Sequence, residues 1–117
     1  EVPEVAWDLI DFAEKPTTII YPKGKNLAPN ATAADGSIGI RMVKTGPLHQ
    51  LIQRFGKPIV STSANLSGEE SPQRISEINP EIASKVDLIV DLPTDNTNKA
   101  SSIIKIGLNG EFKIIRK

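Results

Sequence analysis

The sequence predicts an α/β domain built around a mixed sheet. Strand-like and helix-like segments alternate over the first sixty residues, which is typical of α/β folds. The chain then ends in two apolar, β-branched segments joined by a turn that contains Asn109 and Gly110, a strong signal for an antiparallel hairpin. Because both arrangements occur in one chain, a sheet with parallel and antiparallel neighbours is expected.

The first elements follow from local patterns. Apolar residues at helical spacing after Pro3 predict a short helix over residues 3–13. A β-branched run closed by proline predicts a strand over 17–21. Residues 22–36 are rich in proline, glycine and asparagine and predict a loop with a tight turn at its end, and a second strand is expected over 37–43.

The middle of the chain continues with a helix and weaker signals. Gly46 and Pro47 open a helix with one apolar face, which Gly56 ends. Residues 58–61 predict a short buried strand, and 74–85 a weak helix.

The last third of the chain predicts mainly strands. Another strand is expected over 87–90, followed by a polar loop over 91–100. The hairpin strands are expected over 102–106 and 111–115.

The composition excludes several classes of protein. The chain has 14 basic and 14 acidic residues, so no broad charged surface for nucleic acid or membranes is expected. It has no cysteine and a single histidine, His49, which excludes disulfides, cysteine–zinc sites and multi-histidine metal sites. Its longest apolar runs are far shorter than a membrane span. No metal-ligating residue is therefore assigned, and no membrane partner is expected.

The most unusual segment is 61–68, which places four hydroxyls, one amide and one glycine directly after the predicted strand. Ligands in open α/β sheets bind at the carboxyl ends of strands, and hydroxyls with free backbone N–H groups suit phosphate or carboxylate oxygens. The same residues also suit a solvated loop, with Asn65 and Ser67 forming turns and caps. No histidine or acidic residue adjoins the serines, so no catalytic nucleophile is assigned.

Two arginines and one serine pair are further candidates. Arg41 lies on a strand otherwise built for burial, and Arg116 follows an apolar pair. A guanidinium in such a place can hold a carboxylate or phosphate with two parallel hydrogen bonds. Ser101 and Ser102 precede a buried-looking strand. The alternatives are ordinary surface arginines and a polar strand start.

Taken in order, these segments resemble the YrdC-like family of threonylcarbamoyl-AMP synthases. The resemblance runs from about residue 12 to the end and is most specific at Ser63-Ala64-Asn65-Leu66-Ser67-Gly68. It also rests on residues 16–20, 35–41, 56–62, 101–104 and 114–116. The resemblance implies a twisted mixed sheet folded around a concave, positively lined cavity, of which residues 1–117 would form a partial domain lacking the N-terminal half.

The resemblance also implies a function. Family members join L-threonine, bicarbonate and ATP into threonylcarbamoyl-AMP, and partner proteins pass the threonylcarbamoyl group to tRNA. The chain is therefore expected to be part of a cytoplasmic nucleotidyltransferase of tRNA processing, which becomes active when completed by the other half. Magnesium is expected to accompany ATP. Double-stranded RNA or tRNA is an expected partner, because some members are described as binding RNA.

Residue roles are carried over by position. On the ATP side the resemblance implies Ser37, Ser63, Asn65, Ser71 and Arg116. On the threonine side it implies Arg41, Ser61 and Ser101. These roles need oriented reactants and neutralised charge rather than a covalent intermediate.

The alternative is a non-catalytic module of the same fold that binds RNA or a nucleotide. The family's Lys-x-Arg pair and threonine-rich loop are not found in this sequence, which favours that alternative. A second alternative is a paralogue group of the same fold whose reaction is unclear, and the intact Ser63-Ala64-Asn65 argues against it. In either case a partial domain is expected to expose apolar surface.

Overall fold

The computed structural model describes residues 2–92 and 100–117. The chain folds into two compact units. Unit 1 consists of Glu1–Lys44 and Ser101–Lys117, and unit 2 of Thr45–Ala100. No described helix is long and apolar enough to cross a membrane.

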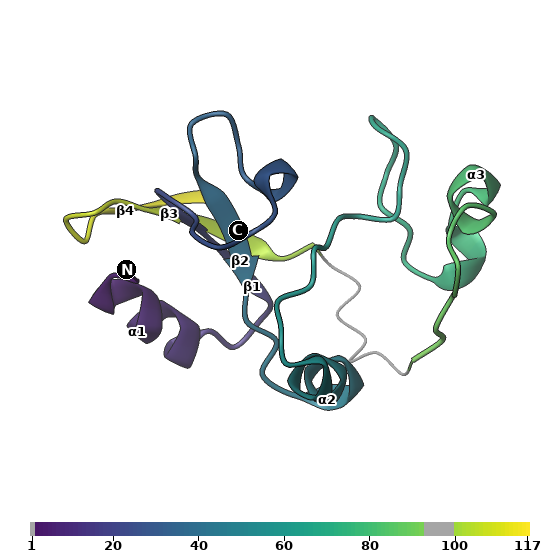
Figure 1. Cartoon of the computed structure of the whole chain (residues 1–117), viewed down its shortest axis with the longest axis horizontal. Coiled ribbons are helices and arrows are strands. Elements are labelled where there is room, and N and C mark those ends of the chain that lie inside the picture. Colours follow the sequence, from purple (N-terminus) through teal and green to yellow (C-terminus); the bar gives the residue numbers. More distant parts are fainter. Residues whose placement is uncertain (1, 93–99) are drawn as a thin grey trace. The chain divides into compact units, whose positions relative to one another are not determined.

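Unit 1 is a four-stranded mixed sheet (Figure 1). Its strands are β1 (Thr17–Tyr21), β2 (Ile38–Arg41), β3 (Ser102–Ile106) and β4 (Phe112–Arg116), in the spatial order β2-β1-β3-β4. β1 pairs antiparallel with β2 and parallel with β3, and β3 pairs antiparallel with β4. The mixed sheet and all four of these predicted strands are thus confirmed, β1 and β3 with the predicted bounds and β2 and β4 with ends shifted by one or two residues.

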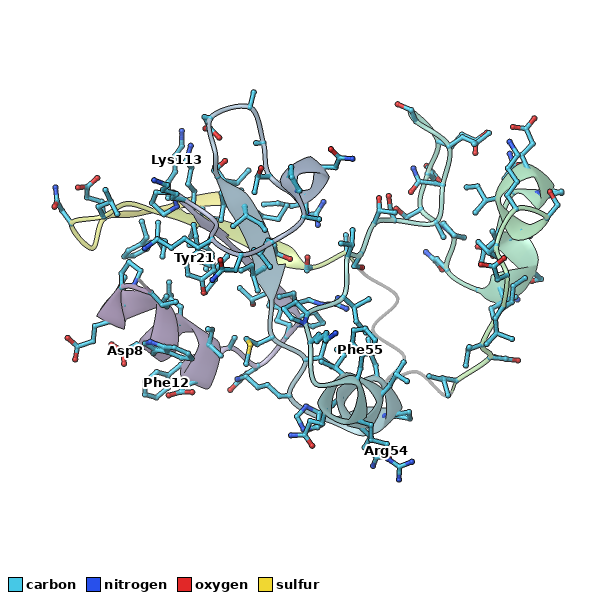
Figure 2. All side chains as sticks on the ribbon, viewed as in Figure 1. Asp8, Phe12, Tyr21, Arg54, Phe55 and Lys113 are labelled. Atoms are coloured by element: carbon cyan, nitrogen blue, oxygen red, sulfur yellow. The ribbon has the colours of Figure 1, made fainter. Side chains whose placement is uncertain are left out.

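One face of this sheet carries the core. Helix α1 (Glu4–Phe12) contributes Ala6, which packs with residues of three strands. The buried set is Ala6, Ile19, Tyr21, Ile38 and Ile106. Burial raises the pKa of the Tyr21 phenol, whose ring is labelled in Figure 2. The predicted helix over 3–13 is confirmed, and its side chains form the second layer of this core.

Local contacts fix the ends of these elements. Lys44 Nζ donates to the carbonyl oxygens of Asp11 and Ala13, at 3.3 and 3.0 Å, where the end of α1 leaves carbonyls without helical partners. Gly36 has φ of 86° and Gly110 has φ of 83°, values that favour glycine. Both predicted tight turns are therefore confirmed.

Unit 2 contains α2 (Gly46–Phe55), a 3₁₀ turn η2 (Ile75–Glu77) and a short helix α3 (Pro80–Ala83). Pro47 lies in the first turn of α2, and Gly56 ends it with φ of 72° and an N–H donated to the Ile52 carbonyl at 3.0 Å. This helix is confirmed with the predicted start and end.

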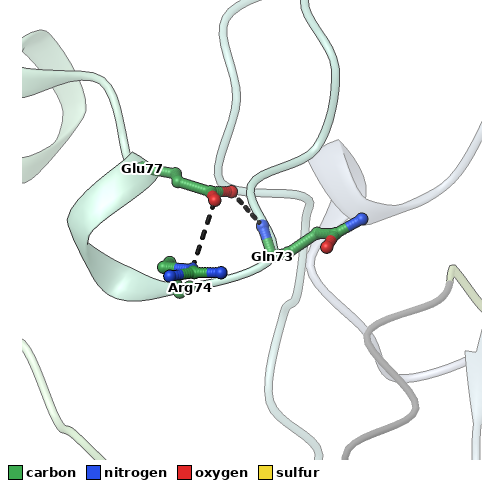
Figure 3. A network of polar contacts seen from close by, with 3 residues as sticks. All are labelled: Gln73, Arg74 and Glu77. Carbon is green, nitrogen blue, oxygen red and sulfur yellow. Dashed lines mark hydrogen bonds and ion pairs between the residues drawn. The ribbon is translucent and has the colours of Figure 1, made fainter.

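A small polar network holds η2. The Glu77 carboxylate accepts a hydrogen bond from the Gln73 backbone N–H at 2.9 Å and lies 3.3 Å from Arg74 Nε (Figure 3). The ion pair is exposed, so it stabilises the turn only weakly.

The predicted helix over 74–85 is wrong as a single element. Pro80 disfavours helical geometry in the residue before it. Asn79 instead becomes the N-cap of α3, and its Oδ1 accepts the Glu81 N–H at 2.9 Å. Two short turns therefore replace one helix.

The predicted strands over 58–61 and 87–90 are also wrong for this chain. Neither segment pairs with a strand, and the side chains of Ile59, Val60 and 88–90 are exposed. Their composition favours strands, but a strand forms only where another backbone accepts its hydrogen bonds, and the sheet of the described residues includes neither segment. The predicted polar loop over 91–100 lies mostly outside the described residues.

Candidate functional site

A row of four residues crosses the sheet of unit 1. Arg41 of β2 pairs with Thr18 of β1, Thr18 pairs with Ile103 of β3, and Ile103 pairs with Arg116 of β4. Thr18, Arg41 and Ile103 alternate with core residues such as Ile19, so they lie on the face opposite α1. The β3–β4 register shifts between Ile103 and Ile104, and Arg116 lines a hollow on the core side with Ile104 and Ile114. The two edge strands therefore each carry one arginine of the row, and only Arg41 lies on the face opposite α1.

Ser101 connects the middle of this row to one arginine. Its hydroxyl lies 2.7 Å from the Thr18 hydroxyl, in a partly buried hydrogen bond. Its carbonyl oxygen accepts two hydrogen bonds from Arg116, one from Nε at 2.9 Å and one from Nη2 at 2.7 Å. The start of β3 is thus held from both neighbouring strands.

The two arginines differ in what remains available for a ligand. A guanidinium has five N–H donors, and Arg116 uses two of its five on Ser101. The Arg41 side chain is exposed, and its guanidinium has no hydrogen bond or ion pair within the described part of the chain. The arginines are three strand spacings apart, or about 14 Å. Arg41 and Arg116 can therefore each still donate hydrogen bonds to an anionic group.

Thr18 belongs to this site although the sequence did not indicate it. The alternation of residues 17–21 places Thr18 on the face opposite Ile19. That pattern was visible in the sequence. Its partners Arg41 and Ser101 depended on strand pairing, which no local signal specifies.

Ser37 lies at the other end of the sheet. It precedes β2, four residues and about 13 Å from Arg41 along the strand. Its hydroxyl and its backbone N–H donate to Asp35 Oδ1 at 2.6 and 2.9 Å. Both hydrogen bonds lower the pKa of the Asp35 carboxyl, and the one from the Ser37 hydroxyl has the larger effect. Ser37 and Asp35 line a shallow hollow of about 410 Å³ with Lys105 and Glu111.

The remaining predicted residues lie in the loop over 61–73 of unit 2. Asn65 Nδ2 donates to the carbonyls of Leu66 and Glu69, at 3.0 and 3.2 Å, and its Oδ1 accepts the Ser71 hydroxyl at 3.3 Å. The turn-forming role considered for Asn65 is thus confirmed.

Ser61 and Ser63 are exposed, and the described residues offer no partner to either hydroxyl. They follow an unpaired segment rather than a strand, so the argument from a strand's carboxyl end does not apply to them.

An apolar hollow of about 530 Å³ lies on the core side of unit 1. It is lined mainly by residues of α1, β3 and β4, including Arg116, and by Lys117. Phe12, labelled in Figure 2, is 83% exposed at its margin. No group of three histidine, aspartate or glutamate side chains within residues 2–92 and 100–117 could hold a metal ion.

Comparison with known proteins gives consistent matches. The family model for Sua5/YciO/YrdC, described as "Telomere recombination", matches residues 1–117. A protein of Methanocaldococcus jannaschii named "Putative threonylcarbamoyl-AMP synthase" is 39% identical over 107 residues, covering 90% of this chain and 49% of that protein.

Two bacterial proteins named "Threonylcarbamoyl-AMP synthase" are also similar. The protein of Wigglesworthia glossinidia brevipalpis is 37% identical, over 86% of this chain and 50% of its own length. The protein of Pseudoalteromonas translucida is 34% identical, over 86% of this chain and 54% of its own length. The chain thus spans about half the length of these curated relatives. No solved structure matches the chain significantly.

Proposed function

This chain belongs to the Sua5/YciO/YrdC family, and we propose that it forms part of the substrate site of an L-threonylcarbamoyladenylate synthase acting in the threonylcarbamoyladenosine modification of tRNA. The observation that carries the proposal is the similarity to proteins named for this activity, at 34–39% identity over 86–90% of the chain. The substrates would be ATP, L-threonine and bicarbonate.

The row on the sheet of unit 1 supports different ligands for its two arginines. Arg41, which has no other partner among the described residues, would hold the threonine carboxylate in a two-donor hydrogen bond. Ser101 would contact threonine beside it. Arg116 would use its three remaining N–H groups on the nucleotide phosphates.

The proposed reaction needs no covalent intermediate between the protein and a substrate. Forming an adenylate from ATP with release of pyrophosphate breaks the bond between the α- and β-phosphates. The protein must then orient the attacking carbamate and neutralise charge on the phosphates. In this proposal Arg116 neutralises charge and Arg41 orients threonine, so neither residue becomes covalently attached to a substrate.

Residues of the unit 2 loop are also proposed to contact ATP. Ser63 offers an uncommitted hydroxyl, whereas Asn65 would act mainly by holding the loop shape through its two carbonyl contacts. Ser71 supports Asn65 directly. Ser61 is proposed on the threonine side, and Ser37 on the ATP side.

Further partners follow from the proposed reaction. Magnesium would enter with the ATP phosphates, because Mg²⁺ is commonly bound by substrate phosphates with few protein ligands. The product would pass to tRNA-modification proteins in the cytoplasm. Binding of tRNA or double-stranded RNA by this chain is part of the proposal.

A chimera would test the proposal. The whole 117-residue chain replaces the matched region of the M. jannaschii relative. Pyrophosphate release is then measured with all three substrates and with each omitted in turn. Release that requires threonine, bicarbonate and ATP together supports the synthase. ATP binding without release would refute it and favour the non-catalytic module of the same fold.

A further inference from the structure

A pair of hydroxyls joins β1 to the start of β3 in the middle of the unit 1 sheet. The hydroxyl oxygens of Thr18 and Ser101 lie 2.7 Å apart, are partly buried, and can each be the donor. A hydroxyl carries one proton and two acceptor lone pairs. One member of the pair therefore donates to the other, and the member that accepts keeps its proton for a further partner.

The direction of the Thr18 side chain is set from the other side by Gly39 of β2. A Cβ atom placed on Gly39 would lie 3.2 Å from Thr18 Cγ2, which is closer than the best separation of two carbon atoms. The Thr18 methyl group thus lies toward β2, while its hydroxyl lies toward Ser101. Because a β-branched side chain has few χ1 rotamers, the space that Gly39 leaves for the methyl group directs the hydroxyl to Ser101.

The backbone around Ser101 is held by other contacts. Its carbonyl oxygen accepts the two hydrogen bonds from Arg116. The backbone N–H of Ser102 donates to the Pro16 carbonyl at 2.9 Å. Thr18 is therefore not needed to place the Ser101 backbone, and its own contribution is to the direction of the Ser101 hydroxyl.

Thr18 and Arg41 are partners in register on the face opposite α1, and the Ser101 hydroxyl meets Thr18 there. We propose that Thr18 is a positioning residue for the threonine substrate. Its hydroxyl donates to Ser101 Oγ, so that the Ser101 proton is left for the substrate. A hydroxyl that accepts a hydrogen bond also becomes a stronger donor. This inference rests on the proposed function, which places the threonine substrate at Ser101 and Arg41.

Two substitutions in the chimera separate the hydroxyl from the methyl group. Thr18→Val removes the hydroxyl and keeps the branched shape, whereas Thr18→Ser keeps the hydroxyl. In calorimetric titrations, Thr18→Val should raise the dissociation constant for threonine about three- to tenfold, the range for one neutral hydrogen bond. It should leave ATP binding unchanged, and Thr18→Ser should bind threonine as the unsubstituted chimera does.

Thr17→Val is the matched control. It makes the same chemical change at the neighbouring residue, whose hydroxyl donates to the Lys15 carbonyl at 3.0 Å instead. Thr17→Val should leave the dissociation constants for threonine and ATP unchanged.

A double substitution tests whether Thr18 acts through Ser101. If it does, a chimera with both Thr18→Val and Ser101→Ala should bind threonine as weakly as one with Ser101→Ala alone. If Thr18 acts independently, the two losses should multiply, which would overturn the inference.

Gly39→Ala supplies a second route that removes no hydroxyl. Its Cβ would press on the Thr18 methyl group, so threonine binding should weaken. Thr18→Ser has no such methyl group, so adding it to Gly39→Ala should restore threonine binding. An equal loss with threonine or serine at position 18 would overturn the inference, and this pair decides the matter if urea titration shows that Thr18→Val does not fold.

Failure of this inference can be told apart from failure of the proposed function. Unchanged threonine affinity in a folded Thr18→Val chimera would overturn the inference alone, because the substrate would still bind. A chimera that binds no threonine would refute the proposed function, and this inference with it.

Discussion

Replacing Arg41 by alanine should separate threonine binding from folding. The described residues give the Arg41 guanidinium no intramolecular partner, so its loss should change the free energy of unfolding by no more than about 0.5 kcal/mol. A charge-assisted hydrogen bond to a ligand contributes about 1.5–3 kcal/mol. In the chimera, the dissociation constant for threonine should therefore rise about tenfold to more than a hundredfold.

Calorimetric titration of the chimera with threonine and with ATP would measure this effect. Arg41→Lys should recover only part of the affinity, because lysine lacks the planar pair of donors. Arg54→Ala is a matched control, since Arg54 is also an exposed arginine but lies at the end of α2 in unit 2. Equal, small losses for both ligands in both alanine variants would identify Arg41 as an ordinary surface residue and refute its proposed role.

Three further predictions follow from unit 1. Arg116→Ala should weaken ATP binding about tenfold or more and threonine binding less, and the reverse order in the same titrations would contradict the assignment. Ile106→Ala should lower the free energy of unfolding by about 2–5 kcal/mol in urea titrations, because Ile106 is 2% exposed in a core of few residues; a loss below about 1 kcal/mol would show that this core is not tightly packed. Ser37→Ala should raise the pKa of the Asp35 carboxyl in an NMR titration, because the hydroxyl that donates to it is removed. Because the pKa is lower in the folded state, the Asp35 carboxylate stabilises the fold at pH values above the unfolded-state pKa, and this stabilisation is lost as pH falls through the folded-state pKa. An unchanged Asp35 pKa in the variant would refute the hydroxyl as the cause.

Local sequence patterns predicted most of the sheet unit. The strands β1 and β3 have β-branched residues, and the hairpin before β4 has the turn residues Asn109 and Gly110. The ends of α2 followed from Pro47 and Gly56 in the same way. These signals act over a few residues, so they survive in a chain that spans only half the length of its relatives.

The two failed strand predictions have a different physical cause. Residues 58–61 and 87–90 have strand composition, but pairing needs a second backbone at the right distance, which the sheet of the described residues does not supply. The weak helix predicted over 74–85 failed for a local reason instead, because Pro80 and the Asn79 cap divide the segment. Composition therefore indicates what a segment can form, and tertiary contacts decide whether it forms.

The candidate site shows the same limit. Arg41, Ser101 and Arg116 were chosen from the sequence because each lies near a strand that looked buried. Only strand pairing explains why they meet around Thr18.

Parallel pairing of β1 and β3 is the step that assembles this row. It brings Ser101 to Thr18 across 83 positions of sequence, and β2 brings Arg41 to the same level from the other side. Every contact that fixes the row lies within unit 1, so its geometry depends on the core formed with α1. The loop around Asn65 is shaped instead by hydrogen bonds within six residues of it. A core substitution such as Ile106→Ala should consequently disturb the arginine row and leave the Asn65 loop intact, which is why the two parts of the proposed site can be perturbed separately.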